Sequence, residues 1–262
     1  MVTTTLKNIL PNYVKHPLLA TTLWYWQRRG LPAQSRGDLA IFKDILLSVE
    51  ALDLRIFEWG SGASTVYYSQ FLRASGREFN WYAGDNSMDW CGRCQQKVDK
   101  NSLTERVHLF CSEFPAFWQV SGYSYTNPVP PQEYLDDPMV KQYVENPKTI
   151  GGEFDMMIID GRFRRRCLQV AADVISPSGI VILHDAQRAH YHPSLELYPH
   201  VKFLETGSLP GTNQTSTIAL ASVGAGDLIS ELAEKYRGLA SSRSGYQKIV
   251  QPTRENRSGR FH

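Results

Sequence analysis

The stretch that decides the fold is Phe57-Glu58-Trp59-Gly60-Ser61-Gly62-Ala63-Ser64-Thr65. It joins a short apolar strand, predicted at residues 56–59, to a helix predicted at about 64–74. The glycines at positions 60 and 62 allow a sharp turn and a close approach to a ligand, because neither carries a Cβ. The N–H groups at the start of the helix point to the same place. A plain strand-to-helix turn has the same pattern, so the motif alone leaves both interpretations open.

Outward from this turn, strand and helix patterns alternate along the chain. Further helices are predicted at 88–100 and 162–175, and the strands at 56–59, 79–83, 107–111, 154–159, 180–183, 201–205 and 216–221. Continuous apolar strands separated by helices predict a parallel sheet that is covered on both faces. The last two strands have no helix between them. We therefore expect a Rossmann-like α/β fold, with a mostly parallel seven-stranded sheet that ends in an antiparallel hairpin.

The 262 residues suit one α/β domain of about 200 residues with additions at both ends. We expect an N-terminal helical cap at 1–50, with a helix at 38–49, then the main domain at 51–225. A C-terminal helix and a basic tail follow at 226–262. Residues 119–150 are rich in Tyr and Pro. They are predicted to be an insert with one short helix, at about 132–144, that forms a lid over one side of the ligand site.

Composition argues against several classes of protein. The net charge of +2 gives no electrostatic case for nucleic acid or a membrane surface as a partner. No apolar run is long enough to span a bilayer, and the N-terminus lacks the pattern of a secretory signal. The four cysteines are too few and too scattered for a disulfide scaffold, which fits a reducing cytoplasm. Two of them, Cys91 and Cys94, form a C-x-x-C that we interpret as two incidental thiols.

Acidic residues follow three of the predicted strands. Asp85 ends the second strand, 23 residues after Gly62. A carboxylate at about this spacing accepts the two ribose hydroxyls in nucleotide-binding α/β folds. Asp160 and Asp185 follow two further core strands, at the edge where open α/β sheets bind ligands. Each acid could instead be a turn or cap residue, but their common position favours a ligand site.

Taken together, these motifs resemble the class I S-adenosylmethionine-dependent methyltransferases, over roughly residues 36–222. One subgroup has an F-E-W-G-S-G-x-S-T turn, a D-G-R after strand four and a D-x-x-R-x-x-Y after strand five. It also has an acid five residues before a Trp. The matching residues here are Phe57 to Thr65, Asp160-Gly161-Arg162, Asp185-Ala-Gln-Arg188-Ala-His-Tyr191, and the pair Asp85 and Trp90.

The resemblance implies S-adenosylmethionine as the cofactor. It also implies methyl transfer to an oxygen of a small-molecule or glycan acceptor, such as a sugar or a small hydroxylated metabolite. The expected cofactor-binding residues are Glu58, Gly60, Ser61, Gly62, Ser64, Asp85, Asn86, Ser112, Glu113 and Asp160. The expected catalytic residues are Asp160, His184 and Asp185 as candidate bases, with Arg162 and Arg188 orienting the acceptor.

Some features depart from the pattern or leave an alternative open. Gly84 stands where an apolar residue is usual. The metal-dependent catechol-type methyltransferases use an Asp-Asn pair after strand five, and Ala186 stands at the Asn position, which disfavours a divalent metal without excluding it. Residues 164–166 are three arginines that fit a solvated helix face as well as an anion site. The aromatic residues at 118–143 fit a substrate wall or a core under a loop.

Two other classes of function remain as alternatives. A nucleotide-binding oxidoreductase of the Rossmann type would need a third glycine, and Thr65 stands at that position. A methyltransferase-like module could also bind without catalysing a reaction, since a fold does not guarantee activity. The acids at the strand ends argue against such a module. Comparing the binding of NAD and S-adenosylmethionine separates the first alternative from the main hypothesis.

Overall fold

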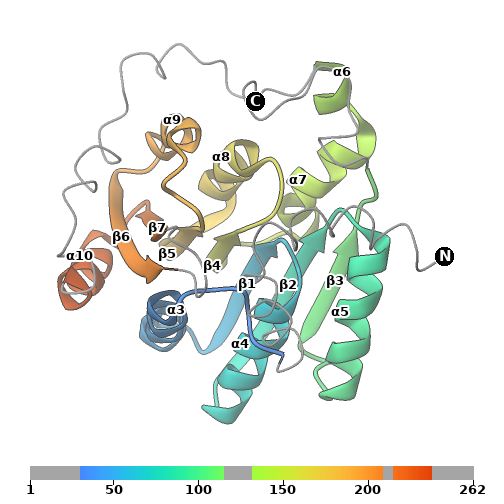
Figure 1. Ribbon diagram of the computed structural model, residues 1–262, viewed down its shortest axis with the longest axis horizontal. Helices are drawn as coiled ribbons and strands as arrows, with labels where there is room; N and C mark the ends of the chain where they lie inside the picture. The colour runs from blue at the N-terminus through green and yellow to red at the C-terminus, as the bar shows by residue number, and fades with distance from the viewer. Residues whose placement is uncertain (1–29, 115–131, 209–214, 238–262) are drawn as a thin grey trace.

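The computed structural model describes residues 30–114, 132–208 and 215–237, and contains a seven-stranded sheet in the order β3-β2-β1-β4-β5-β7-β6 (Figure 1). β1 to β5 are parallel, and the β6–β7 hairpin joins through β7, which is antiparallel to β5 and to β6. The strands are β1 (Asp53–Trp59), β2 (Glu78–Asp85), β3 (Val107–Cys111), β4 (Phe154–Ile159), β5 (Ile175–Leu183), β6 (His200–Ser208) and β7 (Thr215–Ser222). This is the predicted seven-stranded α/β fold.

Helices cover both faces of the sheet (Figure 1). One apolar cluster joins α3, α4, α5 and α10 to one face, and a second joins α6, α7, α8 and α9 to the other. From Met156 to Ile159, successive residues of β4 alternate between the two clusters, and for this reason that part of the strand is continuously apolar. The helices are α3 (Arg36–Ser48), α4 (Ala63–Ala74), α5 (Met88–Lys100), α6 (Gln132–Leu135), α7 (Pro138–Ile150), α8 (Arg164–Val174), η2 (Ala189–Tyr191), α9 (His192–Leu195) and α10 (Gly226–Lys235).

Hydrogen bonds fix the start of α3 to the terminal hairpin. Ser35 caps the helix in a capping box with Asp38, and its hydroxyl also donates to the carbonyl of Thr206 at 2.7 Å. The fully buried carboxylate of Asp38 accepts hydrogen bonds from the hydroxyls of Thr206 and Ser216. A Cβ at Gly37 would overlap the carbonyl of Thr206, so the helix and hairpin are in close contact. This anchor places residues 31–34 beside the site described below.

Two of the predicted helices and strands differ most from those in the structure. The single helix expected at about 132–144 is two helices, α6 and α7. α7 packs on the sheet and against α8, as the ordinary crossover between parallel strands, because its buried residues form one apolar stripe. β5 begins at Ile175, earlier than expected, since Ile175 pairs with Phe154 before a shift in register. Residues 1–29, 115–131 and 238–262 of the predicted cap, insert and tail lie outside the described residues.

A disulfide joins Cys91 of α5 to Cys111 of β3, so the interpretation of Cys91 as an incidental thiol was wrong. The two residues are 20 positions apart in sequence, but α5 packs against β3 and brings their Cα atoms to 6.4 Å. Cys94, the other member of the C-x-x-C, is buried and not oxidised. The cytoplasmic location stays a prediction. Among the described helices, none is long and apolar enough to span a membrane.

Candidate active site

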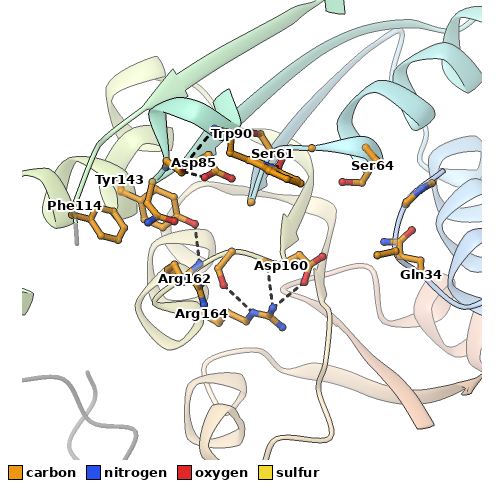
Figure 2. Close-up of a pocket in the computed structure, with 18 of the residues that line it drawn as sticks. Gln34, Ser61, Ser64, Asp85, Trp90, Phe114, Tyr143, Asp160, Arg162 and Arg164 are labelled. Carbon is orange, nitrogen blue, oxygen red and sulfur yellow. Dashed lines mark hydrogen bonds and ion pairs between the residues drawn. The ribbon is translucent and has the colours of Figure 1, made fainter. Parts of the chain in front are cut away.

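A cavity of about 720 Å³ lies at the carboxyl ends of the central strands (Figure 2). The strand order reverses between β1 and β4, and ligands of open α/β sheets bind at such a switch point. The volume falls in the range typical of small-molecule sites. The lining residues come from six separate segments: 31–34, 60–64, 85–87 with Trp90, 113–114, Tyr143, and 160–162 with Arg164.

The turn after β1 packs directly against the turn after β4. Gly60 has a φ of +103°, which favours glycine, and its N–H donates to the carbonyl of Gly84 at 2.8 Å. A Cβ at Gly60 would lie 2.8 Å from the backbone nitrogen of Gly161. A Cβ at Gly161 would in turn overlap the hydroxyl of Tyr143. The absence of these Cβ atoms lets the two turns meet and exposes their backbone to the cavity.

Glu58 lies beneath the cavity and does not line it. Its side chain is fully buried, and its carboxylate accepts hydrogen bonds from Ser64 Oγ at 2.6 Å, Thr65 Oγ1 at 2.6 Å and Trp81 Nε1 at 3.0 Å. Thr65 Oγ1 also accepts from the N–H of Gly62 at 2.9 Å. Burial raises the pKa of Glu58 to about 7. Glu58 therefore shapes the glycine turn from behind, through Ser64 and Thr65.

Asp85 stands at the rim of the cavity, at the end of β2. It is largely buried, and its carboxylate accepts from the N–H of Ser87 at 3.1 Å. Burial raises its pKa to about 6, although the positive charge of Arg162 opposes this increase. Trp90 donates from its indole nitrogen to the carbonyl of Ser61 and forms the next part of the rim (Figure 2). A carboxylate fixed in this position can accept hydrogen bonds from two neighbouring hydroxyls.

The residues after β3 divide between the cavity and the core. Glu113 is exposed and Phe114 is buried, and both line the cavity. Ser112 is buried and does not line it, and its N–H donates to the carbonyl of Asp85 at 3.0 Å. Ser112 thus connects the end of β3 to the end of β2, whereas Glu113 and Phe114 line the cavity.

Six charged side chains alternate in sign across the ends of β4 and β5, and we call them the charge chain. Their order, from the buried end to the exposed end, is Asp38, His184, Asp160, Arg164, Asp185 and Arg188. The nearest charged atoms of successive members are 3.6, 3.1, 2.9, 3.3 and 2.9 Å apart. The side chain of Asp38 is fully buried and that of Arg188 is half exposed. Each buried charge therefore has a partner of opposite sign.

The charge chain determines the protonation of its members. Burial lowers the pKa of His184, but Asp160 and Asp38 outweigh this effect and raise the pKa well above its usual value. Burial raises the pKa of Asp160, but the charges of His184 and Arg164 lower it to about 2. At neutral pH His184 is therefore an imidazolium and cannot accept a proton. Asp160 is ionised, and of the three candidate bases it is the one that lines the cavity.

An aromatic cluster forms the wall of the cavity beside α7. The ring of Phe114 lies 5.3 Å from that of Tyr143 and 5.5 Å from that of Phe163, centre to centre, and Tyr134 packs on both Phe114 and Phe163. The hydroxyl of Tyr143 accepts from the N–H of Arg162 at 3.0 Å. Tyr143 is almost fully buried and also lines the cavity. Tyr143 is thus a core residue that also faces the cavity, and its role as a wall for the substrate stays a prediction.

The segment before α3 bounds the other end of the cavity (Figure 2). Gln34 is buried, and its side-chain carbonyl oxygen accepts from the hydroxyl of Tyr68 at 2.5 Å. This bond makes the amide nitrogen the group that Gln34 offers to a ligand. Sequence reasoning missed Gln34, because nothing in the pattern of residues 30–35 distinguishes it from other polar residues at the start of a helix.

Most of the predicted site residues meet in this one cavity. Those that line it are Gly60, Ser61, Gly62, Ser64, Asp85, Asn86, Glu113, Asp160 and Arg162. Those that do not line it are Glu58, Ser112, His184, Asp185 and Arg188. Arg164 was not distinguished from its two neighbours in sequence, but it is buried between Asp160 and Asp185. Its position four residues after Asp160 was the available signal.

Comparison with known proteins supports the fold. No family model and no curated protein matches the sequence. A putative O-methyltransferase from Klebsiella pneumoniae matches with 18% identity over 80% of this chain and 90% of that chain, with a TM-score of 0.50. Cofactor-bound Rv0187 from MTB matches with 14% identity over 79% of this chain and 90% of that chain, with a TM-score of 0.50. The fold is that of the Rossmann-like class I methyltransferases.

Proposed function

We propose that this chain is an S-adenosylmethionine-dependent methyltransferase that acts on an oxygen of a small hydroxylated acceptor. The observation that carries the proposal is that the glycine turn after β1 and Asp85 line the same cavity, at the switch point of the sheet. A Cβ at Gly60 would press on the backbone of Gly161, and a Cβ at Gly62 would press on Trp90, so both glycines are needed for the shape of this turn. The residues present therefore fit a ligand that has an amino-acid end and a ribose.

The lining suggests a role for each segment around the cofactor. The N–H groups at the start of α4 and the amide of Gln34 would bind the carboxylate of the methionine part. Asp85 would accept the ribose hydroxyls, and Glu113 and Phe114 would face the adenine. When bound, the cofactor supplies an activated methyl group on a sulfonium. The chain itself would hold the acceptor oxygen in line with that group and exclude water.

The protonation states in the charge chain narrow the class of acceptor. A general base works best when its pKa is near the working pH, and the pKa of Asp160 is about 2. Such a carboxylate accepts a hydrogen bond well but takes a proton from an ordinary alcohol poorly. We therefore favour an acceptor whose hydroxyl is already acidic, such as a phenol or an enol, over a sugar hydroxyl. The aromatic wall around Phe114 and Tyr143 offers flat apolar faces for a ring-bearing acceptor.

The lid hypothesis stays part of this proposal. Residues 119–150 would form one side of the acceptor pocket, with the described part, α6 and α7, as its base. Because Val140, Tyr143 and Val144 belong to the core, only the part before α6 can be removed without harm to the fold. Shortening residues 119–131 should leave cofactor binding intact while methyl transfer falls sharply. Full transfer activity in the shortened protein would refute the lid.

Calorimetric titration tests the cofactor assignment. S-adenosylhomocysteine should bind to the native protein, and NAD should not. Asp85→Asn should weaken the binding of S-adenosylhomocysteine by roughly 5- to 150-fold. This range corresponds to a loss of about 1–3 kcal/mol in binding free energy, as expected for hydrogen bonds to a charged group. Asp89→Asn, at an exposed position on the first turn of α5, is the matched control and should bind normally. No binding at millimolar concentrations, or tight binding of NAD, would refute the proposal.

Radiolabelled S-adenosylmethionine tests the acceptor class. A panel of phenols, enols and sugars should show transfer of the label to the acidic hydroxyls first. Transfer to sugars with none to phenols would leave the cofactor assignment intact and refute the argument from Asp160.

A further inference from the structure

Three side chains that could hold a divalent metal meet at the ends of β4 and β5. One ligand atom from each of Asp160, His184 and Asp185 lies within 4.8 Å of the others. The resemblance to metal-dependent catechol-type methyltransferases would place an ion between the two carboxylates. The spacing of these three ligand atoms fits one divalent ion. Whether an ion can bind then depends on whether other groups already occupy the carboxylate oxygens.

Arg164 occupies the position between the two carboxylates. Its Nη2 atom lies 2.9 Å from Asp160 Oδ1, and its Nη1 atom lies 3.3 Å from Asp185 Oδ2. Backbone carbonyls fix the guanidinium in this place: Nε donates to Gly161 at 3.1 Å, Nη1 to His184 at 2.5 Å and Nη2 to Asp160 at 2.9 Å. An arginine side chain stays protonated in proteins, so this charge is permanent.

The other groups around the carboxylates leave little for a metal to bind. Asp185 Oδ2 also contacts Arg188 Nη2 at 2.9 Å, and His184 Nδ1 is 3.1 Å from Asp160 Oδ1. Two aspartates therefore face two arginines, and their charges cancel before any ion is added. Ala186, at the position of the third metal ligand in the catechol-type enzymes, offers no side-chain oxygen and is fully buried. A divalent ion does not fit this arrangement.

We infer that Arg164 is the resident cation of this site and takes the position that a divalent metal holds in catechol-type enzymes. Its role is that of a positioning residue. It holds the Asp160 carboxylate at the cavity wall and ties the ends of β4 and β5 together through Asp185. Arg164 excludes the metal through its own contacts, together with the contacts of Arg188 and His184 and the missing side-chain oxygen at position 186. Only its place in methyl transfer rests on the proposed function.

Titration with Mn²⁺, followed by electron paramagnetic resonance of the free ion, tests this inference. The native protein should bind no Mn²⁺ at concentrations up to about 1 mM. Arg164→Ala uncovers the two carboxylates and should gain one Mn²⁺ site, which a further Asp185→Asn substitution should remove. Arg164→Lys keeps a positive charge and should gain none. Arg166→Ala, on the same helix and in contact with the carbonyl of Leu135, is the matched control and should also gain none.

Two outcomes would overturn the inference directly, and Mn²⁺ binding by Arg164→Lys would overturn it as well. One is Mn²⁺ binding to the native protein that Asp185→Asn abolishes. The other is a folded Arg164→Ala protein, judged by circular dichroism, that binds no Mn²⁺. If Arg164→Ala does not fold, the native protein and Arg164→Lys decide the matter, since binding by either refutes the inference. Binding of S-adenosylhomocysteine is measured on the same samples, so failure of the cofactor assignment is seen separately from failure of the metal argument.

Discussion

Replacing Glu58 by glutamine should remove a large part of the pH dependence of stability. Glu58 is fully buried, and burial raises its pKa from an ordinary value of 4.5 to about 7. Between these two values the folded protein keeps the proton while the unfolded chain has lost it. The folded state then binds more protons than the unfolded state, so the free energy of unfolding falls as the pH rises. Above pH 7 the penalty is constant.

The pKa increase sets the size of the effect. An increase from 4.5 to about 7 corresponds to about 3 kcal/mol of stability lost between those pH values. The glutamine side chain of the Glu58→Gln protein would resemble the protonated acid. Its oxygen can accept from Trp81 and Thr65, and its amide nitrogen can donate to Ser64, whose hydroxyl can rotate to accept. The Glu58→Gln protein should therefore lose much less stability across this range than the native protein loses.

Urea unfolding at several pH values between 5 and 8 measures the effect. The difference in unfolding free energy between native protein and Glu58→Gln isolates Glu58, because other titrating groups are common to both. Glu50→Gln, at an exposed site after α3, is the control and should follow the native protein at every pH. Parallel curves for the native protein and Glu58→Gln would refute the reasoning that Glu58 is buried as an acid with a raised pKa.

Three further predictions concern the cavity and its frame. Affinity for S-adenosylhomocysteine should fall as the pH drops through about 6, because protonation of Asp85 removes a hydrogen-bond acceptor, and Asp85→Asn should flatten this pH profile in calorimetry. Gly161→Ala should destabilise the protein by about 1–3 kcal/mol in urea unfolding, because the new Cβ would overlap the hydroxyl of Tyr143. Tyr143→Phe removes that hydroxyl and should recover part of the loss in the double mutant. If the two effects were strictly additive, the overlap would be contradicted. Cys91→Ser should lower the free energy of unfolding by about 3 kcal/mol, as expected for opening a disulfide loop of this length. An unchanged urea midpoint under non-reducing conditions would show that the disulfide does not form in solution.

The sequence predicted the fold well because each core strand carries its own signal. β4 is a continuous apolar run between Asp155 and Asp160, and such a run specifies a buried parallel strand without knowledge of its neighbours. The turn after β1 was equally clear, because glycines at positions 60 and 62 allow a sharp bend between a strand and a helix. Helix α7 was less clear. Tyr143 and Pro147, together with the Tyr- and Pro-rich residues before it, made this crossover helix resemble an insertion in the sequence.

The site was predicted in part, because a sequence specifies the position of a residue but not the direction of its side chain. Glu58 and Asp85 both lie near the carboxyl end of a strand, yet Glu58 is buried beneath the turn and Asp85 lies at the rim of the cavity. Arg164 looked like one of three equal arginines. Its spacing of four residues from Asp160 was a weak signal, and its contact with Asp185 at the end of β5 became visible only in the structure. The disulfide was invisible for the same reason, since it depends on how α5 lies beside β3.

The charge chain has a consequence for how this sequence can change. Loss of one buried member leaves its partners with an uncompensated charge, which costs about 3–5 kcal/mol, whereas replacing neighbours together can cost little. A protein of marginal stability therefore tolerates the joint replacement of neighbouring charges far better than the loss of a single one. In relatives of this chain, we expect Asp38, His184, Asp160, Arg164 and Asp185 to be inherited or lost as a block. These five positions come from three separate stretches of the sequence, around residues 38, 160–164 and 184–185. Covariation between these stretches would distinguish relatives that share this site from relatives that keep only the fold.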